Sequence, residues 1–209
     1  MLLTLIILYI ITLIYFSIVE RFRNYSSLIA VQGWLLLGIA LLRLHTLDWM
    51  ELSFIITETL IFKALIVPGI LMRVIKKTGI NRISSTGTSQ FNSLMLSIAA
   101  LTISAILTYY VADQTINMIF FGVALYALLT GLILIVLRSR IFTHMVGFLV
   151  IENGVFLFSM AIGVEMPLLI NAAIMLDILL SVLMLGLFMT KVDKHIHTDD
   201  SDSLTHVKD

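Results

Sequence analysis

Residues 142–163 read FTHMVGFLVIENGVFLFSMAIG, and residues 167–190 read PLLINAAIMLDILLSVLMLGLFMT. Both runs are long enough to cross the roughly 30 Å hydrocarbon core of a membrane as helices. Each carries one acid near its midpoint, Glu152 in the first run and Asp177 in the second. A charge at that depth costs about 2.5 to 3.5 kcal/mol on insertion scales, so such groups usually face a bundle interior. The two runs therefore predict a polar site in the middle of a membrane.

Apolar runs of similar length recur along the whole chain. Of its 209 residues, 60% are hydrophobic and 12% are charged, and the mean hydropathy is +1.08; a soluble domain is about 25% charged. The runs lack the alternation of membrane barrel strands, which favours helices. We expect an all-α integral membrane protein, a bundle of seven transmembrane helices with spans at about 2–19, 26–43, 51–75, 91–112, 117–137, 142–163 and 167–190.

These spans form one predicted transmembrane domain, residues 1–190. The Gly-, Ser- and Thr-rich segment 78–90 is predicted to be a cytoplasmic linker, and residues 191–209 a polar cytoplasmic tail. The first run has no basic segment before it and no small-residue cleavage site. We therefore expect it to be retained as a span, not removed as a signal peptide.

The positive charges predict how the chain is oriented. Eleven of the thirteen lysines and arginines fall on one predicted side of the membrane, Arg43 falls on the other, and Lys63 lies within a span. Cytoplasmic loops carry the excess of positive charge. The N-terminus is thus predicted to lie outside and the C-terminus in the cytoplasm.

Several function classes are excluded by composition. The chain has no cysteine, which excludes disulfides and thiolate-bound metal in this chain. It has no net charge and no basic stripe, so we expect no nucleic-acid partner. No nucleophile with its base, phosphate loop or metal cluster is apparent. We expect a chain that holds no cofactor or metal and is not an enzyme by itself.

Lys63 is the most specific single signal. It lies at the midpoint of the run 51–75, too deep to reach either interface easily. We expect it to contact Glu152 or Asp177. If both acids are ionised, the charges of the three groups sum to minus one. A low dielectric then favours keeping one proton on the trio. The trio is therefore a candidate proton path; the alternative is a static ion pair that holds helices together.

Two further ionisable residues are weaker candidates for the proton path. Glu58 lies five residues before Lys63, which on an α-helix places them about 140° apart, on different faces. It would extend a path outward or pair with another subunit. His144 lies about 12 Å of helix rise from Glu152. A histidine suits a proton entry point, and the alternative is an ordinary interfacial residue.

Pro68 is the candidate for a helix kink. It cannot donate to the helix and leaves the carbonyl of Ala64, next to Lys63, without its usual partner. A kink there would admit water beside the lysine; the alternative is an ordinary tolerated membrane proline. Uncharged polar residues in the spans are expected to hold water or orient the charged groups: Gln32, Thr59, Asn153 and Ser181.

Three segments carry a resemblance to a known family: FKALIVPGILMRVIKK (62–77), GFLVIENG (147–154) and NAAIMLDILLSVLML (171–185). Together they resemble hydrogenase-4 component E, a membrane subunit of group 4 [NiFe] hydrogenases, including formate hydrogenlyase-type complexes. The segment 117–190 also resembles the three-span K subunit of respiratory complex I and the C subunit of multisubunit cation/proton antiporters. Asp177 matches the second intramembrane glutamate of those subunits, and Glu152 is displaced by about one turn from the first.

The resemblance implies a membrane subunit of a proton-translocating complex in the cytoplasmic (inner) membrane of a prokaryotic cell. It would link a hydrogenase or quinone-anchoring module to antiporter-like subunits, and nickel, iron–sulfur clusters and any flavin would belong to other subunits. Lys63 would contribute to the proton path although the shorter K subunit has no counterpart for it. The alternatives are a structural connector without proton transfer, a subunit of a cation/proton antiporter, and an independent small transporter.

Overall fold

The computed structural model describes residues 1–43, 56–78, 89–111, 116–138 and 141–162. Within these ranges every regular element is a helix, which confirms the all-α prediction there. Six helices are present if the contiguous elements η1 and α4 are taken as one. The elements are α1 (Leu2–Phe16), α2 (Phe22–Arg43), η1 (Glu58–Ile66), α4 (Val67–Thr78), α5 (Gln90–Tyr110), α6 (Met118–Leu137) and α7 (Ile141–Ile162).

Four of these helices are long and apolar enough to cross a membrane, which makes the chain a membrane protein by the length and composition of its helices. They are the segments Phe22–Leu42, Gln90–Tyr110, Met118–Leu137 and Phe142–Ile162. α1 is shorter, with 15 residues. The predicted seventh span, 167–190, and the tail, 191–209, lie outside the described residues, and with them Asp177 and Ser181.

Helix ends differ from the predicted span ends. α2 begins at Phe22, four residues before the predicted span, and the third helix continues to Thr78, the first residue of the predicted linker. Residues 79–88 of that linker lie outside the described part. The physical reason for the difference is that an apolar run marks where side chains avoid water. A helix continues through Arg and Lys, which are good helix formers.

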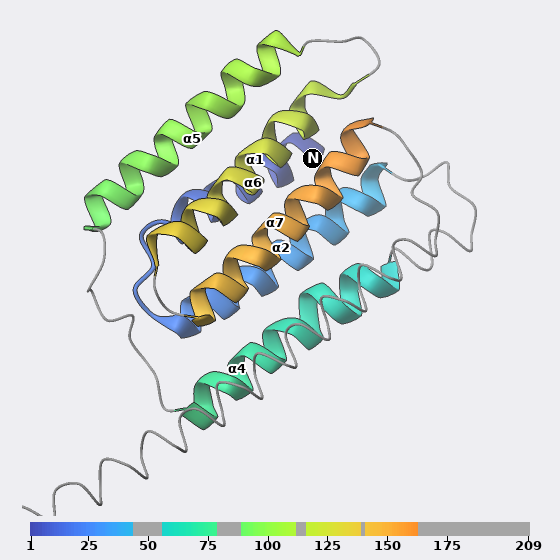
Figure 1. Cartoon of the computed structure of the whole chain (residues 1–209). Coiled ribbons are helices and arrows are strands. Elements are labelled where there is room, and N and C mark those ends of the chain that lie inside the picture. Colours follow the sequence, from blue (N-terminus) through green and yellow to red (C-terminus); the bar gives the residue numbers. More distant parts are fainter. Residues whose placement is uncertain (44–55, 79–88, 112–115, 139–140, 163–209) are drawn as a thin grey trace, which may run out of the picture.

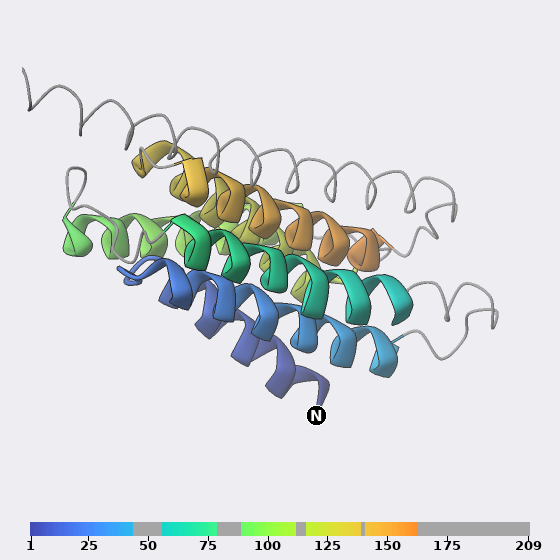
Figure 2. The same cartoon turned by 90° about the horizontal axis from the view of Figure 1, so that it is seen from below.

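The order in which the helices pack against one another differs from their order along the chain. α6 and α7 form the most extensive contact, α5 covers α6 at one edge, and α2 lies against α7 (Figure 1). The helix formed by η1 and α4 packs on α2 at the opposite edge from α5. Figure 2 shows from below that α2 lies between α1 and this helix. α2 therefore contacts α1, η1 and α7.

Glycines allow two pairs of helices to touch through their backbones. A Cβ atom added to Gly131 of α6 would lie 2.6 Å from the carbonyl oxygen of Gly147 in α7, and one added to Gly147 would lie 2.7 Å from that of Gly131. A Cβ atom added to Gly33 of α2 would lie 2.8 Å from Cα and N of Ala64 in η1. Small residues permit such close packing between membrane helices. Through Gly33, the backbone of α2 directly contacts η1 beside Lys63.

Candidate functional site: a buried polar cluster between α1, α2, η1 and α7

η1 is a π-helix of nine residues that contains Lys63. Hydrogen bonds in a π-helix join residues five apart. Such segments are rare in proteins, and those that occur often lie at functional sites. The winding returns to α at Val67, one residue before Pro68, whose ring nitrogen has no hydrogen to donate. The carbonyl oxygen of Pro68 accepts a hydrogen bond from Ser26 Oγ of α2 at 2.9 Å. This stretch is therefore fixed to α2 at two places, at Ala64 next to Lys63 through Gly33 and at Pro68 through Ser26.

The structure brings Lys63 and Glu152 together. Lys63 Nζ lies 2.6 Å from Glu152 Oε1, and the two side chains are 8% and 12% exposed. The same ammonium lies 4.4 Å from the ring centroid of Phe156, one helical turn after Glu152 on α7. A cation above an aromatic face is attracted to it. The contact between Lys63 and Glu152 expected from the sequence is thus present, and its role in proton movement stays a prediction.

A buried ion pair of this geometry can hold a proton in two places. Burial penalises both charges, whereas their mutual attraction favours them, so the net contribution of such a pair to stability is small. Moving one proton from the ammonium to the carboxylate neutralises both groups and crosses only the 2.6 Å between Nζ and Oε1. Chemically, the arrangement can store, accept or release one proton.

A chain of three uncharged side chains runs from α1 to α7 beside this pair. Asn153 Nδ2 donates to Gln32 Oε1 at 3.2 Å, and Gln32 Nε2 donates to Thr12 Oγ1 at 3.1 Å. Thr12 Oγ1 in turn donates to the carbonyl oxygen of Tyr9 at 2.6 Å. Gln32 is fully buried and Asn153 is 2% exposed. Because Asn153 adjoins Glu152, this chain fixes the position of α7 at the ion pair.

For the other predicted site residues the structure gives less direct evidence of a role. Thr59 is fully buried on η1, four residues before Lys63. His144 is half-buried near the start of α7, and its Nε2 contacts the carbonyl oxygen of Arg138. This contact with the end of α6 is local, and the two turns of α7 between His144 and Glu152 keep them apart.

The separation of Glu58 and Lys63 onto different faces, expected from α-helical geometry, is wrong. Both residues belong to η1. Because π-helical hydrogen bonds join residues five apart, the backbone positions 58 and 63 are one turn apart on the same face. Nothing in the sequence pattern distinguishes a π-helical turn from an α-helical one, so the error follows from the assumed winding.

Three residues of the site were not anticipated from the sequence: Tyr9, Thr12 and Gly33. Tyr9 and Thr12 lie three apart in an apolar helix and share its buried face with Leu13 and Phe16. This spacing is a usable signal, but an aromatic residue in an apolar run normally indicates packing. Gly33 adjoins Gln32, and a glycine beside a buried amide could have indicated a close helix contact.

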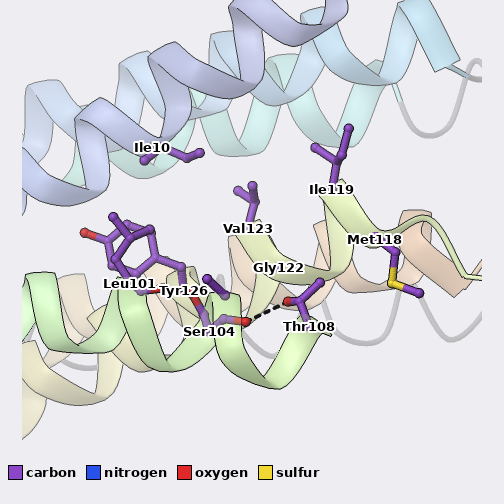
Figure 3. Close-up of a pocket in the computed structure, with 10 residues that line it drawn as sticks. Ile10, Leu101, Ser104, Thr108, Met118, Ile119, Gly122, Val123 and Tyr126 are labelled. Carbon is purple, nitrogen blue, oxygen red and sulfur yellow. Dashed lines mark hydrogen bonds between the residues drawn. The ribbon is translucent and has the colours of Figure 1, made fainter. Parts of the chain in front are cut away.

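A pocket of about 360 Å³ lies away from the polar cluster, between α1, α5 and α6 (Figure 3). Its walls are largely apolar, including Ile10, Leu101 and Val123. Its hydroxyls are already bonded: Thr108 Oγ1 donates to the carbonyl oxygen of Ser104, and the Tyr126 hydroxyl lies 2.7 Å from Ser97 Oγ. We therefore place the candidate site at the Lys63–Glu152 pair and not in this pocket.

Comparison of the chain with models of protein families, with curated proteins and with solved structures gave no match.

Proposed function

We propose that this chain is a membrane subunit of a proton-translocating respiratory-type complex, in which the Lys63–Glu152 pair is part of a proton path at mid-membrane depth. The single observation that carries the proposal is the 2.6 Å contact between the two buried side chains. Intramembrane ionisable residues are expensive and typically mark ion or proton pathways. A pair that exchanges one proton internally can pass it on without leaving an isolated charge in the membrane.

The sequence resemblance to hydrogenase-4 component E supplies the kind of complex. On this proposal the chain joins a [NiFe] hydrogenase module to antiporter-like subunits and itself holds no redox centre. It lies in a prokaryotic inner membrane, with the N-terminus outside and Asp177 and Glu58 extending the path. The proton moves between subunits through groups at one depth, and this chain contributes the segment around Lys63.

A structural connector is the second candidate. The hydrogen-bonded chain from Thr12 through Gln32 to Asn153 favours it, because amide side chains in fixed pairs hold helices together. On this alternative the ion pair only locks η1 to α7. The two functions differ in whether an assembled complex still pumps protons when Lys63 or Glu152 is replaced.

The first experiment is purification of the tagged chain from its native membrane in mild detergent, with identification of the proteins recovered with it. Recovery of a hydrogenase large subunit, iron–sulfur proteins and antiporter-like subunits supports the proposed complex. Recovery of the chain alone, stable and monodisperse, contradicts it and favours an independent transporter.

The second experiment measures proton uptake into liposomes that contain the purified complex, with a fluorescent pH probe. We expect Lys63→Gln and Glu152→Gln to assemble and to pump at least tenfold more slowly, because each removes one proton site of the pair. Lys76→Gln is the matched control, since Lys76 is an exposed lysine on α4. Assembled Lys63→Gln complexes that pump at the wild-type rate would favour the connector.

A further inference from the structure

The pocket of about 360 Å³ between α1, α5 and α6 has no part in the proposed function. Its volume lies within the range of small-molecule sites in proteins, about 300 to 1,000 Å³. It shares no lining residue with the polar cluster around Lys63 and Glu152. A ligand in this pocket would therefore bind independently of the ion pair.

The polar side chains that line the pocket are already paired within the protein. Ser104 Oγ donates to the carbonyl oxygen of Leu101 at 2.8 Å, and Thr108 Oγ1 donates to that of Ser104 at 2.7 Å. The Tyr126 hydroxyl lies 2.7 Å from Ser97 Oγ. A buried water needs two to four polar partners, and polar ligands are oriented by polar groups in their pockets. The pocket is therefore suited to a hydrocarbon chain.

The pocket cannot be closed by α5 and α6 moving together, because these helices already touch at two levels. One contact is the pair formed by Ser97 and Tyr126. At the other, a Cβ atom added to Gly122 would lie 2.9 Å from Thr108 Oγ1. Ile10 of α1 supplies the opposite wall (Figure 3). Side chains that line a void lose their dispersion contacts on that side, so a filled pocket is more stable than an empty one.

The pocket opens toward the bilayer. Ala105 of α5 and Ile119 of α6 line it, and both residues are exposed. Among the four described membrane-crossing helices α5 is the least buried, with 22% of its apolar stretch buried against 50% or more in the others. Lipid chains beside α5 can therefore enter the pocket laterally.

The pocket also runs along the helices, starting at their ends. Its lining on α5 extends from Thr108, two residues before the helix ends, back to Leu101. Its lining on α6 extends from Met118, the first residue of the helix, to Tyr126. These stretches correspond to about 10 to 12 Å of helix rise. The pocket is thus long enough to hold several methylene groups of an extended chain.

Two tyrosines mark the level at which a chain would enter. Tyr109 and Tyr110 are the last residues of α5, and both are largely exposed. Exposed tyrosines at helix ends typically lie at the headgroup level of a membrane. A chain that enters at this end therefore runs from the headgroup level toward the bilayer midplane, which is the direction of a phospholipid acyl chain.

We propose that this pocket binds an acyl chain of a membrane phospholipid. The carbons near the ester lie beside Thr108 and Met118, and carbons farther along the chain lie beside Leu101 and Tyr126. α5 has little direct contact with α1, so the bound chain supplies packing between these two helices. The inference goes beyond the proposed function and does not depend on it.

The test is photo-crosslinking of the full chain in phosphatidylcholine nanodiscs. The probe is a phosphatidylcholine with a diazirine at one position of an acyl chain, and peptide mass spectrometry identifies the labelled residues. Val123 and Tyr126 are 7% and 0% exposed, so only a chain inside the pocket can label them. Phe148, which is half-exposed on α7, is the reference for bulk lipid. We expect Val123 to be labelled about as strongly as Phe148.

The position of the diazirine tests the direction of the bound chain. A diazirine near the ester should label Met118 more than Tyr126, and one farther along the chain should reverse this ratio, because the two residues differ by about 12 Å in depth. A ratio that does not change, or that changes in the opposite direction, contradicts the proposal. This measurement uses the wild-type chain and needs no variant.

A substitution at the mouth of the pocket tests the site itself. We expect Ala105→Phe to lower the labelling of Val123, relative to Phe148, by about tenfold, because the ring occupies the space of the chain. Ala99→Phe is the matched control, since Ala99 is an exposed alanine of α5 that does not line the pocket. Equal labelling of Val123 in the two variants contradicts the proposal. Should Ala105→Phe fail to fold, the diazirine series in the wild-type chain decides.

A second probe distinguishes the source of the hydrocarbon chain. It is an isoprenoid quinone with a diazirine in its tail, reconstituted in the same nanodiscs. Labelling of Val123 by this probe and not by the phospholipid would overturn the proposal and assign the pocket to an isoprenoid tail. Absence of labelling at Val123 and Tyr126 with both probes would also overturn it.

Discussion

Replacing Lys63 by methionine leaves the Glu152 carboxylate buried without the ammonium that it contacts at 2.6 Å. Breaking a buried ion pair by removing one partner typically costs about 3 to 5 kcal/mol, because the remaining charge is uncompensated. The carboxylate has a second option, which is to take up a proton. For an unperturbed glutamate side chain this costs about 3.7 kcal/mol at pH 7, since that pH lies about 2.7 units above its reference pKa.

The loss of stability in Lys63→Met is therefore limited to about 4 kcal/mol at pH 7 and depends on pH. In the variant the folded state keeps a proton on Glu152 that the unfolded state releases above about pH 4.3, so stability falls as pH rises. We expect the loss to shrink by about 1.4 kcal/mol for each unit that the pH is lowered, to about 1 kcal/mol at pH 5. The wild-type protein, in which Lys63 contacts the carboxylate, is the reference for this loss at each pH.

The assay is equilibrium unfolding in mixed micelles at pH 5, 6 and 7. The double variant Lys63→Met with Glu152→Gln should recover most of the stability and lose the pH dependence, because no buried charge remains. Lys76→Met is the control for a lysine exposed on α4, where we expect a change within about 0.5 kcal/mol. A pH-independent loss in Lys63→Met, or no recovery in the double variant, would refute the reasoning.

Two further substitutions test how the cluster is held. In Gly33→Ala the new Cβ would lie 2.8 Å from backbone atoms of Ala64, so α2 and η1 must separate; we expect a loss of about 1 to 3 kcal/mol in the same unfolding assay. Gly69→Ala is its control, because nothing lies within 4 Å of that Cβ and alanine should stabilise the helix by about 0.5 to 1 kcal/mol; equal effects at both positions would contradict the close contact. Gln32→Leu leaves the Asn153 amide buried without its acceptor and should cost about 1 to 3 kcal/mol. Adding Asn153→Leu should recover part of that loss, and a larger loss in the double variant would contradict a direct bond.

The charged residues of the candidate site could be predicted from the sequence, but the residues that pack around them could not. Lys63 and Glu152 are conspicuous in the sequence because charge within an apolar run is costly wherever the helices pack. Tyr9 and Gly33 were not anticipated, because aromatic and glycine residues are common in membrane helices for packing alone. Which of them lies in the buried cluster beside the ion pair depends on helix rotation and on the neighbouring helices.

The sequence by itself determined that the chain is helical and membrane-embedded, because twenty or so consecutive apolar residues have few other stable structures in water or lipid. Only the tertiary structure decided that Lys63 pairs with Glu152, that Gln32 joins Thr12 to Asn153, and that η1 is wound as a π-helix. The physical reason is that hydropathy determines how deep a residue lies in the membrane but carries little information about which helices face each other. That choice is made by close contacts such as Gly33 against Ala64 and by the need to satisfy every buried polar group.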